Sequence, residues 1–162
     1  MQVTASKGGS IALAEAQLSV PPGAVTGNGH LDASMAAAPP QTAQQAGTGG
    51  SKLLSAVSAP VHFAITGASL TRPVRITFRI PSSAVPTALP AALRSDAVWL
   101  SFYDSAAGRW QPVPSRYDPA AGTVTAEVRH LSWWMPWSWD WTGSVLRLRQ
   151  ALSAFGSGRS SS

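Results

Sequence analysis

The chain contains no cysteine, which excludes disulfide bridges, thiolate metal sites and a thiol nucleophile. Charged residues are scarce as well, at 12% of the 162 residues, so we do not expect a dense network of surface ion pairs. No apolar run reaches the length of about eighteen residues that a membrane-spanning helix needs. Residues 1–20 also lack the charged start and unbroken apolar stretch of a secretory signal. The core must therefore form by packing alone, and the compartment is left unassigned.

Positive charge is in excess but is not concentrated. Twelve Lys and Arg residues against seven Asp and Glu give a formal net charge of +5, and the cations stand singly along the chain. Proteins that bind nucleic acids gather such residues on one element to neutralise successive phosphates. We therefore expect no nucleic-acid partner.

Cofactor and metal motifs are not found. The histidines His30, His62 and His130 lie far apart, with no cysteine or carboxylate at ligand spacing. The Gly-rich stretch at residues 47–52 lacks the flanking strand and helix of a phosphate-binding loop. The sequence predicts neither a metal nor a cofactor.

Short alternations of apolar and polar residues indicate half-buried β-strands. One strand is expected from Ile11 to Val20, ended by two prolines and a glycine at residues 21–23. Asp-led turns at 104–108 and 118–122 separate later strands. The other strands are expected at residues 61–65, 74–80, 98–102 and 123–130.

Turn signals every ten or so residues are typical of a β-sandwich, and an apolar fraction of 44% is enough to fill one core. The sequence therefore predicts a single all-β, antiparallel sandwich over residues 1–137. Residues 41–51 are expected to form a flexible surface loop. Residues 81–95, which contain three prolines, are expected to form a connection with at most one helical turn.

Five tryptophans crowd the end of this domain. Their indole rings combine a large apolar area with a polar N–H, which suits core packing, a partner groove, a membrane interface or a saccharide platform. A strand period of two places Trp134 opposite the other four, although Pro136 leaves the register open. The tryptophans are Trp133, Trp134, Trp137, Trp139 and Trp141.

Residues 138–156 are expected to form a Trp-rich tail with a short amphipathic helix from about Thr142 to Phe155, and residues 157–162 a disordered end. Arg147 and Arg149 on this helix could reach lipid phosphates while the indole rings enter the headgroup layer. We therefore expect the five tryptophans and these two arginines to contact a protein partner, a neighbouring domain or a membrane surface.

The tripeptide His130-Leu131-Ser132 carries residues suited to cutting the backbone. The Ser132 hydroxyl can attack the carbonyl of Leu131 if that peptide unit is bent out of plane. His130 can accept the hydroxyl proton and pass it to the departing amide nitrogen. The opposite interpretation stays open, because a His-x-Ser pair at the end of a strand is often only a hydrogen-bonded structural pair.

Four stretches together resemble the ZU-five domain, a β-sandwich named after zona-occludens and Unc-five proteins. They are Gly8-Gly9-Ser10-Ile11 leading to Leu18-Ser19-Val20-Pro21-Pro22-Gly23-Ala24-Val25; Ala68-Ser69-Leu70-Thr71-Arg72-Pro73-Val74-Arg75-Ile76; Val98-Trp99-Leu100-Ser101-Phe102-Tyr103 with Trp110; and Val128-Arg129-His130-Leu131-Ser132. The last stretch is also similar to the H-L-S/T site of the GAIN/GPS-type cleavage domain of adhesion receptors. Trp99 and Trp110 resemble the two tryptophans that precede that site.

This resemblance implies a single autoproteolytic cut between Leu131 and Ser132, with His130 and Ser132 as the reacting side chains. The chain departs from the receptor group by lacking its cysteines and by having a Trp-rich segment after the site. Two functions follow as hypotheses. One is a self-cleaving module that controls the Trp-rich segment and performs no repeated turnover. The other is a non-catalytic interaction or spacer domain of a larger bacterial surface or signalling protein.

Overall fold

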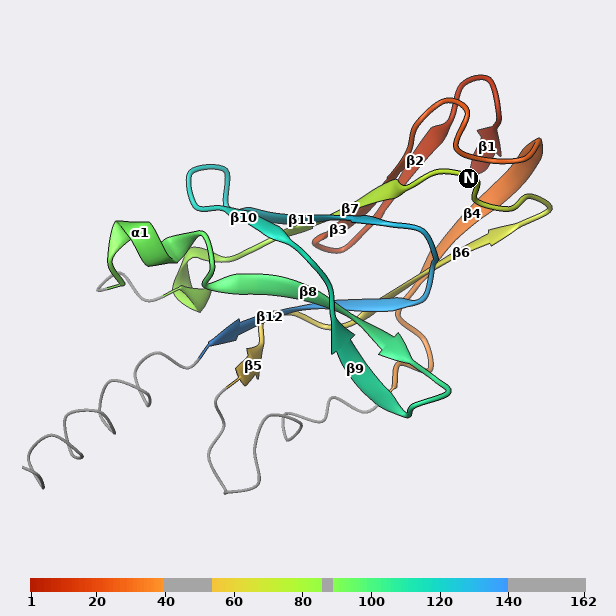
Figure 1. Cartoon of the computed structure of the whole chain (residues 1–162). Coiled ribbons are helices and arrows are strands. Elements are labelled where there is room, and N and C mark those ends of the chain that lie inside the picture. The colour runs from red at the N-terminus through yellow and green to blue at the C-terminus, as the bar shows by residue number, and fades with distance from the viewer. Residues whose placement is uncertain (40–53, 86–88, 140–162) are drawn as a thin grey trace, which may run out of the picture.

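Two antiparallel sheets pack face to face in the computed structural model, which describes residues 1–39, 54–85 and 89–139 (Figure 1). Side chains from both sheets meet in one continuous apolar core. The described part of the chain is thus mostly β-structure, and the predicted all-β, antiparallel sandwich is confirmed at that level.

The larger sheet, sheet A, has seven strands. Its last strand in the sequence, β12, lies in the middle, with β6 and β5 on one side and β8 on the other. Along the sheet the strands are β1 (Gln2–Thr4), β4 (Asn28–Ser34), β6 (Val61–Thr66), β12 (Trp133–Trp139), β8 (Val98–Asp104) and β9 (Arg109–Pro112), and β5 (Leu54–Ala56) pairs with β12 beyond the end of β6.

The smaller sheet, sheet B, has five strands. In order they are β10 (Arg116–Asp118), β11 (Thr123–Val128), β7 (Val74–Arg79), β3 (Ala16–Val20) and β2 (Gly9–Leu13). Between β7 and β8 lie a 3-10 helix (Ser82–Ala84) and the single-turn helix α1 (Ala91–Arg94). The prediction of at most one helical turn in this connection is therefore wrong, because two short helical turns form in it.

The core consists of the inward residues of both sheets. On β7, for example, Val74, Ile76 and Phe78 are buried while Arg75 and Arg79 are exposed, as the alternation predicts. Burying a large apolar side chain stabilises the fold by roughly 1.5–3 kcal/mol. The largest fully buried side chains are Trp134, Phe63, Phe78, Leu18, Leu31, Ile76, Leu100 and Met135.

The two Asp-led turns form as expected. Asp104 Oδ1 accepts hydrogen bonds from the backbone N–H groups of Ala106 and Ala107, at 3.0 and 3.1 Å. Asp118 Oδ1 does the same for Ala120 and Ala121, at 2.9 and 3.1 Å. A carboxylate that bonds the backbone two and three residues ahead holds the chain in a turn.

The expected single strand from Ile11 to Val20 is wrong. The chain reverses at Ala14 and Glu15, so that β2 and β3 form a hairpin in which Leu13 pairs with Ala16. Ala14 has φ = 51°, and a positive φ is typical of the first residue of tight hairpin turns. Residues 14 and 15 include no Gly, Asn or Pro, so the usual turn signal was missing.

Strand β12 continues through Pro136, where the sequence left the register open. On the β8 side, Leu100 lies opposite Pro136, but its N–H donates to Ser115 Oγ at 2.9 Å, so it needs no bond to the proline. The proline nitrogen faces the other side, where β5 ends at Ala56 and β6 begins at Val61. The strand tolerates a proline here because neither neighbouring strand places a carbonyl where it would need a hydrogen bond from the N–H of residue 136.

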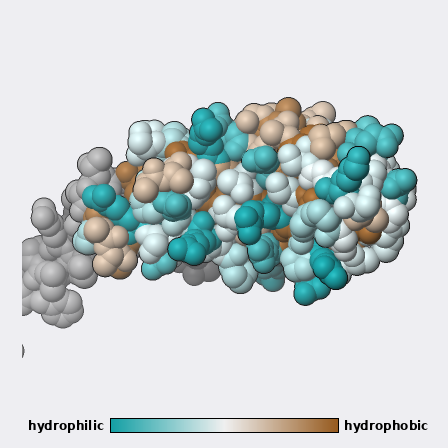
Figure 2. Space-filling view, turned by 90° about the horizontal axis from the view of Figure 1, so that it is seen from above, coloured by the Kyte–Doolittle hydropathy of each residue, from teal (hydrophilic) through white to brown (hydrophobic). Residues whose placement is uncertain are grey.

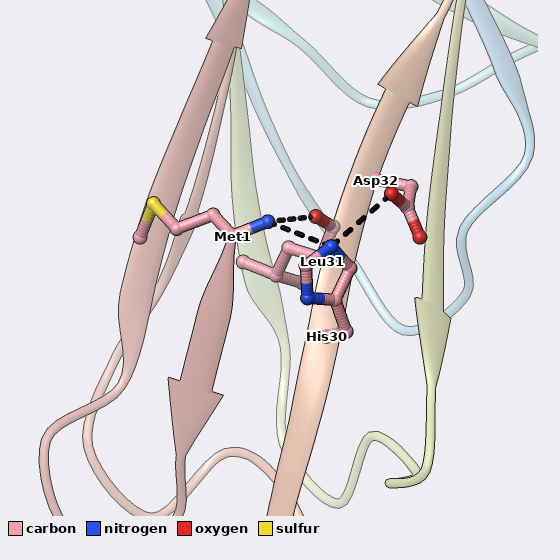
Figure 3. A network of polar contacts seen from close by, with 4 residues as sticks. All are labelled: Met1, His30, Leu31 and Asp32. Carbon is pink, nitrogen blue, oxygen red and sulfur yellow. Dashed lines mark hydrogen bonds and ion pairs between the residues drawn. The ribbon is translucent and has the colours of Figure 1, made fainter.

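The first strand is fixed by contacts around its start (Figure 3). The Met1 amino group donates to the Leu31 carbonyl at 2.6 Å, and it lies 3.1 Å from His30 Nε2. The same His30 nitrogen is 3.4 Å from Asp32 Oδ1. These groups line up along β1 and β4 and hold this edge of sheet A together.

Strand β12 ends at Trp139, two residues beyond the boundary expected for the sandwich at residue 137. The expected loop at 41–51 and nearly all of the expected tail, with its helix and its disordered end, lie outside the described residues.

Candidate functional site

The tripeptide His130-Leu131-Ser132 lies where the chain passes from one sheet to the other. Strand β11 ends in sheet B at Val128, two residues before the expected end at His130, and β12 begins in sheet A at Trp133. The tripeptide therefore belongs to no strand. Its peptide bonds are trans, and none of its residues has a positive φ.

Two polar groups of Ser132, its hydroxyl and its carbonyl, are engaged in this crossing. The hydroxyl donates to the Tyr103 carbonyl, with an oxygen–oxygen distance of 2.9 Å. The Ser132 carbonyl accepts a hydrogen bond from the N–H of Phe63 at 3.0 Å. The residue thus joins β8 to β6 at the start of β12, and its hydroxyl is half-buried.

His130 is exposed but its ring is held by aromatic neighbours. The imidazole meets the ring of Phe102 nearly edge-on, with centroids 4.5 Å apart, and lies 5.6 Å from the ring of Trp134. Over the described ranges, no hydrogen bond joins the imidazole to Ser132. The structure therefore brings the two predicted reactive residues to the same crossing without linking them.

Attack on the Leu131 carbonyl would require two side chains to move from this arrangement. The Ser132 hydroxyl would have to rotate away from the Tyr103 carbonyl and towards the Leu131 carbonyl. The His130 imidazole would have to leave its aromatic neighbours and come within hydrogen-bond reach of that hydroxyl. Leu131 itself is half-buried, and its side chain packs against the core. This packing holds the residue whose carbonyl would be attacked. The sequence indicated His130 and Ser132 as candidate reacting residues, but it carried no signal for Tyr103, Phe102 and Phe63, which come from other strands.

The tryptophans of β12 divide between two environments. Trp134 points inward, is 0% exposed and belongs to the main core. Trp133 and Trp137 point to the outer face of sheet A, as the strand period predicts. There they join a second apolar group, which we call the outer aromatic cluster: buried Trp110, Met135 and Trp137, with half-buried Ala56, Trp99, Tyr103 and Trp133 packed against them.

This division limits what the tryptophans can contact. Trp134 has no exposed surface, and Trp137 is 4% exposed, whereas Trp139 is 40% exposed. Among the residues that the structure describes, the buried indole nitrogens of Trp134 and Trp137 find no hydrogen-bond partner. The remaining predicted contact residues, Trp141, Arg147 and Arg149, lie outside the described residues.

A cavity of about 370 Å³ lies beside Tyr117, lined also by Ile80, Arg94, Pro119 and Gly122 among others. Burial raises the pKa of the Tyr117 hydroxyl above its ordinary value of 10.0; the Asp118 carboxylate raises it further, and Arg94 opposes the shift. Among the described residues that line this cavity, no nucleophile is paired with a base.

Among residues 1–39, 54–85 and 89–139, no three His, Asp or Glu side chains gather as metal ligands. In the same part of the chain no helix is long and apolar enough to cross a membrane.

Comparison with protein-family models finds no match, and comparison with curated protein sequences finds none either. The arrangement at the crossing must therefore be judged on its own chemistry.

Proposed function

We propose that this chain is a ZU-five-like module that cuts its own backbone once, between Leu131 and Ser132. The observation that carries the proposal is the place of the Leu131–Ser132 peptide unit between the two sheets, before the start of β12, with an exposed imidazole beside it. A peptide unit outside a ladder can bend without breaking strand hydrogen bonds. The nucleophile is also adjacent to its target carbonyl, so no substrate has to be bound.

The chemistry needs only the chain and one water molecule. The Ser132 oxygen attacks the Leu131 carbonyl carbon, and His130 accepts the hydroxyl proton. The carbon–nitrogen bond then breaks, and the nitrogen receives the proton, which leaves an ester between the Leu131 carbonyl and the Ser132 oxygen. Water hydrolyses the ester to a new carboxylate at Leu131 and regenerates the hydroxyl of Ser132, whose amino group is now free.

The two products should stay together, because the segment after the cut is the middle strand of sheet A. Strand β12 pairs with β8 on one side and with β6 and β5 on the other, and its Trp134 fills the core. The cut would therefore leave a nicked sandwich. The segment after residue 139, which the sequence predicts to carry a short helix, lies outside the described residues, and on this proposal it is the segment that the cut would control.

Mass spectrometry of the intact chain under denaturing conditions tests the proposal directly. Cleavage predicts two pieces, residues 1–131 and 132–162, from the wild-type chain and one uncut chain from Ser132→Ala. Ser132→Cys should still cut, because a thiol can also attack the carbonyl. Hydroxylamine should speed the appearance of the two pieces, since it attacks the ester.

The histidines offer a matched control. His130→Ala should slow the cut while the fold persists, because the imidazole is on the surface. His62→Ala removes the other imidazole that packs on a β12 tryptophan, Trp133, with ring centroids 5.1 Å apart, and should leave the rate unchanged. A wild-type chain that stays whole after long incubation at neutral pH rejects self-cleavage.

A second candidate is a non-catalytic protein-interaction or spacer domain. It is favoured by the two hydrogen bonds of Ser132 and by the missing bond between His130 and Ser132, which are the contacts of a structural crossing. On this proposal the partner, a neighbouring domain or another protein, meets the exposed part of the outer aromatic cluster. Ser132→Ala would then lower the free energy of unfolding by about 1–2 kcal/mol through the lost hydrogen bond, with no change in chain mass besides the substitution.

A further inference from the structure

The cavity beside Tyr117 has the size of a small-ligand site. Its volume of about 370 Å³ falls within the range of roughly 300–1,000 Å³ that is usual for ligand pockets. It lies at one end of the molecule, where the turn between β10 and β11 meets the connection that carries α1 (Figure 1). His130, Leu131 and Ser132 do not line it, so the cavity is separate from the candidate cleavage site.

Backbone contacts hold the floor of the cavity in place. The N–H of Ile80, directly after β7, donates to the Gly122 carbonyl at 2.8 Å. Gly122 closes the turn that the Asp118 carboxylate fixes, and its φ of 62° lies in the left-handed region that favours glycine. The cavity is therefore formed by the fold itself, which lowers the entropy that a ligand must lose to bind there.

Tyr117 brings a hydroxyl to this cavity from the core. The residue is 5% exposed and belongs to the main core. In the described part of the chain its hydroxyl has no hydrogen-bond partner. Unlike the indole nitrogens of Trp134 and Trp137, the oxygen is not completely buried, and the residue lines the cavity. A ligand there can supply the hydrogen bond that the fold does not.

Arg94 makes the cavity attractive to an anion. Among the residues that line the cavity it is the one charged side chain. Its Nε donates to the Leu89 carbonyl at 3.0 Å, and its charge opposes the rise in the pKa of Tyr117, so the guanidinium lies near that hydroxyl. A guanidinium has five N–H donors, more than the contact with Leu89 uses.

The nearby carboxylate does not cancel this attraction. Asp118 follows Tyr117 on β10, and the strand alternation turns its side chain to the exposed face. It does not line the cavity, and its Oδ1 accepts the two N–H groups of the turn. The raised pKa of Tyr117 keeps the hydroxyl protonated at neutral pH, so this group donates a hydrogen bond.

The remaining walls indicate what the anion is attached to. They are mostly apolar and are formed by Ile80, Val85 and the turn at residues 119–121, with the Ser82 hydroxyl as a further polar group. A free phosphate ion would leave these walls without contacts and would bring more than one negative charge to a single cation. A carboxylate on a small apolar body matches both the charge and the walls.

We propose that this cavity binds a small organic carboxylate. The carboxylate lies between the Tyr117 hydroxyl and the Arg94 guanidinium, and the apolar body lies against Ile80 and the turn at residues 119–121. The proposal concerns binding alone and does not depend on cleavage at Leu131.

Nuclear magnetic resonance of the full, ¹⁵N-labelled chain tests the proposal, with phenylacetate and hexanoate as the probes. The amide signals of Tyr117 and Gly122 should move and saturate at millimolar concentrations, while those of β2 stay in place. The neutral analogue phenylacetamide should bind about tenfold more weakly, because it lacks the charge. The same titration with Ser132→Ala, which has no serine hydroxyl at the crossing, should give the same result.

Matched variants assign the binding to the two polar groups. Arg94→Gln and Tyr117→Phe should each raise the dissociation constant for phenylacetate by about tenfold, because each removes a charged or hydrogen-bonding contact to the carboxylate. Arg116→Gln removes the same charge from an exposed position on β10 that does not line the cavity, and should have no effect. The amide spectrum of each variant without probe reports whether its fold is intact.

Three results would overturn the proposal. The first is that neither carboxylate moves the signals of Tyr117 and Gly122. The second is that phenylacetamide binds as well as phenylacetate, which would make the cavity a site for neutral apolar molecules. The third is that folded Arg94→Gln and Tyr117→Phe variants bind phenylacetate like the wild type, which would place the carboxylate elsewhere.

Discussion

The outer faces of the two sheets are built on different chemistry. Sheet B presents polar rows, in which Arg75 pairs with Glu127 at 3.3 Å and the hydroxyls of Thr77 and Thr125 lie 3.3 Å apart. Figure 2, which looks onto the molecule from the side of sheet B in Figure 1, shows hydrophilic residues spread among hydrophobic ones. Sheet A carries the outer aromatic cluster on its β5, β8, β9 and β12 strands.

The difference shows that β12 is not a half-buried strand like those of sheet B. Its residues from Trp134 to Ser138 are buried on both faces. A strand buried on both faces appears in sequence as a continuous apolar run instead of an alternation. The outer aromatic cluster thus serves as a small second core, and substitutions on the two faces of β12 should be more alike than substitutions on the two faces of β7.

The largest effect is expected for the inward tryptophan. Trp134→Ala should lower the free energy of unfolding by about 3–5 kcal/mol, because it leaves a large cavity in the main core. Urea denaturation followed by circular dichroism measures the change. Leu93→Ala, at an exposed position of α1, should change it by less than about 0.5 kcal/mol.

The outward tryptophan tests whether the second core is real. Trp137→Ala should cost about 2–3 kcal/mol in the same assay, less than Trp134→Ala because a thinner cluster can collapse around the gap. A loss in the free energy of unfolding below about 1 kcal/mol would show that the outer aromatic cluster contributes no more than ordinary surface residues do. The outer faces of sheets A and B would then not differ in their contribution to stability.

A smaller effect is expected on the outer face of sheet B. Replacing Thr77 and Thr125 together by valine should change the free energy of unfolding by less than about 1 kcal/mol, because valine keeps the shape and suits a strand. A double-mutant cycle gives the coupling of the two hydroxyls. A coupling energy above about 2 kcal/mol between the Thr77 and Thr125 hydroxyls would show that this exposed face contributes to stability as strongly as a core does.

The smallest effect concerns the edge of sheet B and appears only in alkali. Burial raises the pKa of Tyr117 above 10.0, so the unfolded chain loses this proton at lower pH than the folded chain. The contribution of Tyr117 to the free energy of unfolding is therefore complete below pH 10.0, and it is lost as the pH rises through the pKa of Tyr117 in the folded state. Tyr117→Phe should flatten the fall of the free energy of unfolding above that pH, and an unchanged slope would contradict it.

Strands with one polar face could be predicted from the sequence, as β7 shows, and so could the turns held by Asp104 and Asp118. The hairpin at Ala14 could not, because alanine carries no turn signal and a positive φ is imposed on it by the pairing around it. The continuation of β12 through Pro136 could not either, since it depends on a break between β5 and β6 that only the assembled sheet reveals.

The candidate site shows the same limit. His130 and Ser132 stand out in the sequence, because their chemistry is local. The hydrogen bond from Ser132 to Tyr103 joins residues 29 positions apart in the chain, and the ring that holds His130 comes from the same distant strand. Contacts of this kind follow from strand order, which the alternation of residues does not encode.

The central place of β12 has a consequence for how the molecule is made. This strand is the last of the described strands to leave the ribosome, yet it joins the β1–β4–β6 half of sheet A to the β8–β9 half. Until it arrives, the two halves share no ladder and the groove between them is open. A chain interrupted before residue 133 would therefore leave β5, β6 and β8 without the strand that they share, and such unpaired edges are prone to aggregate.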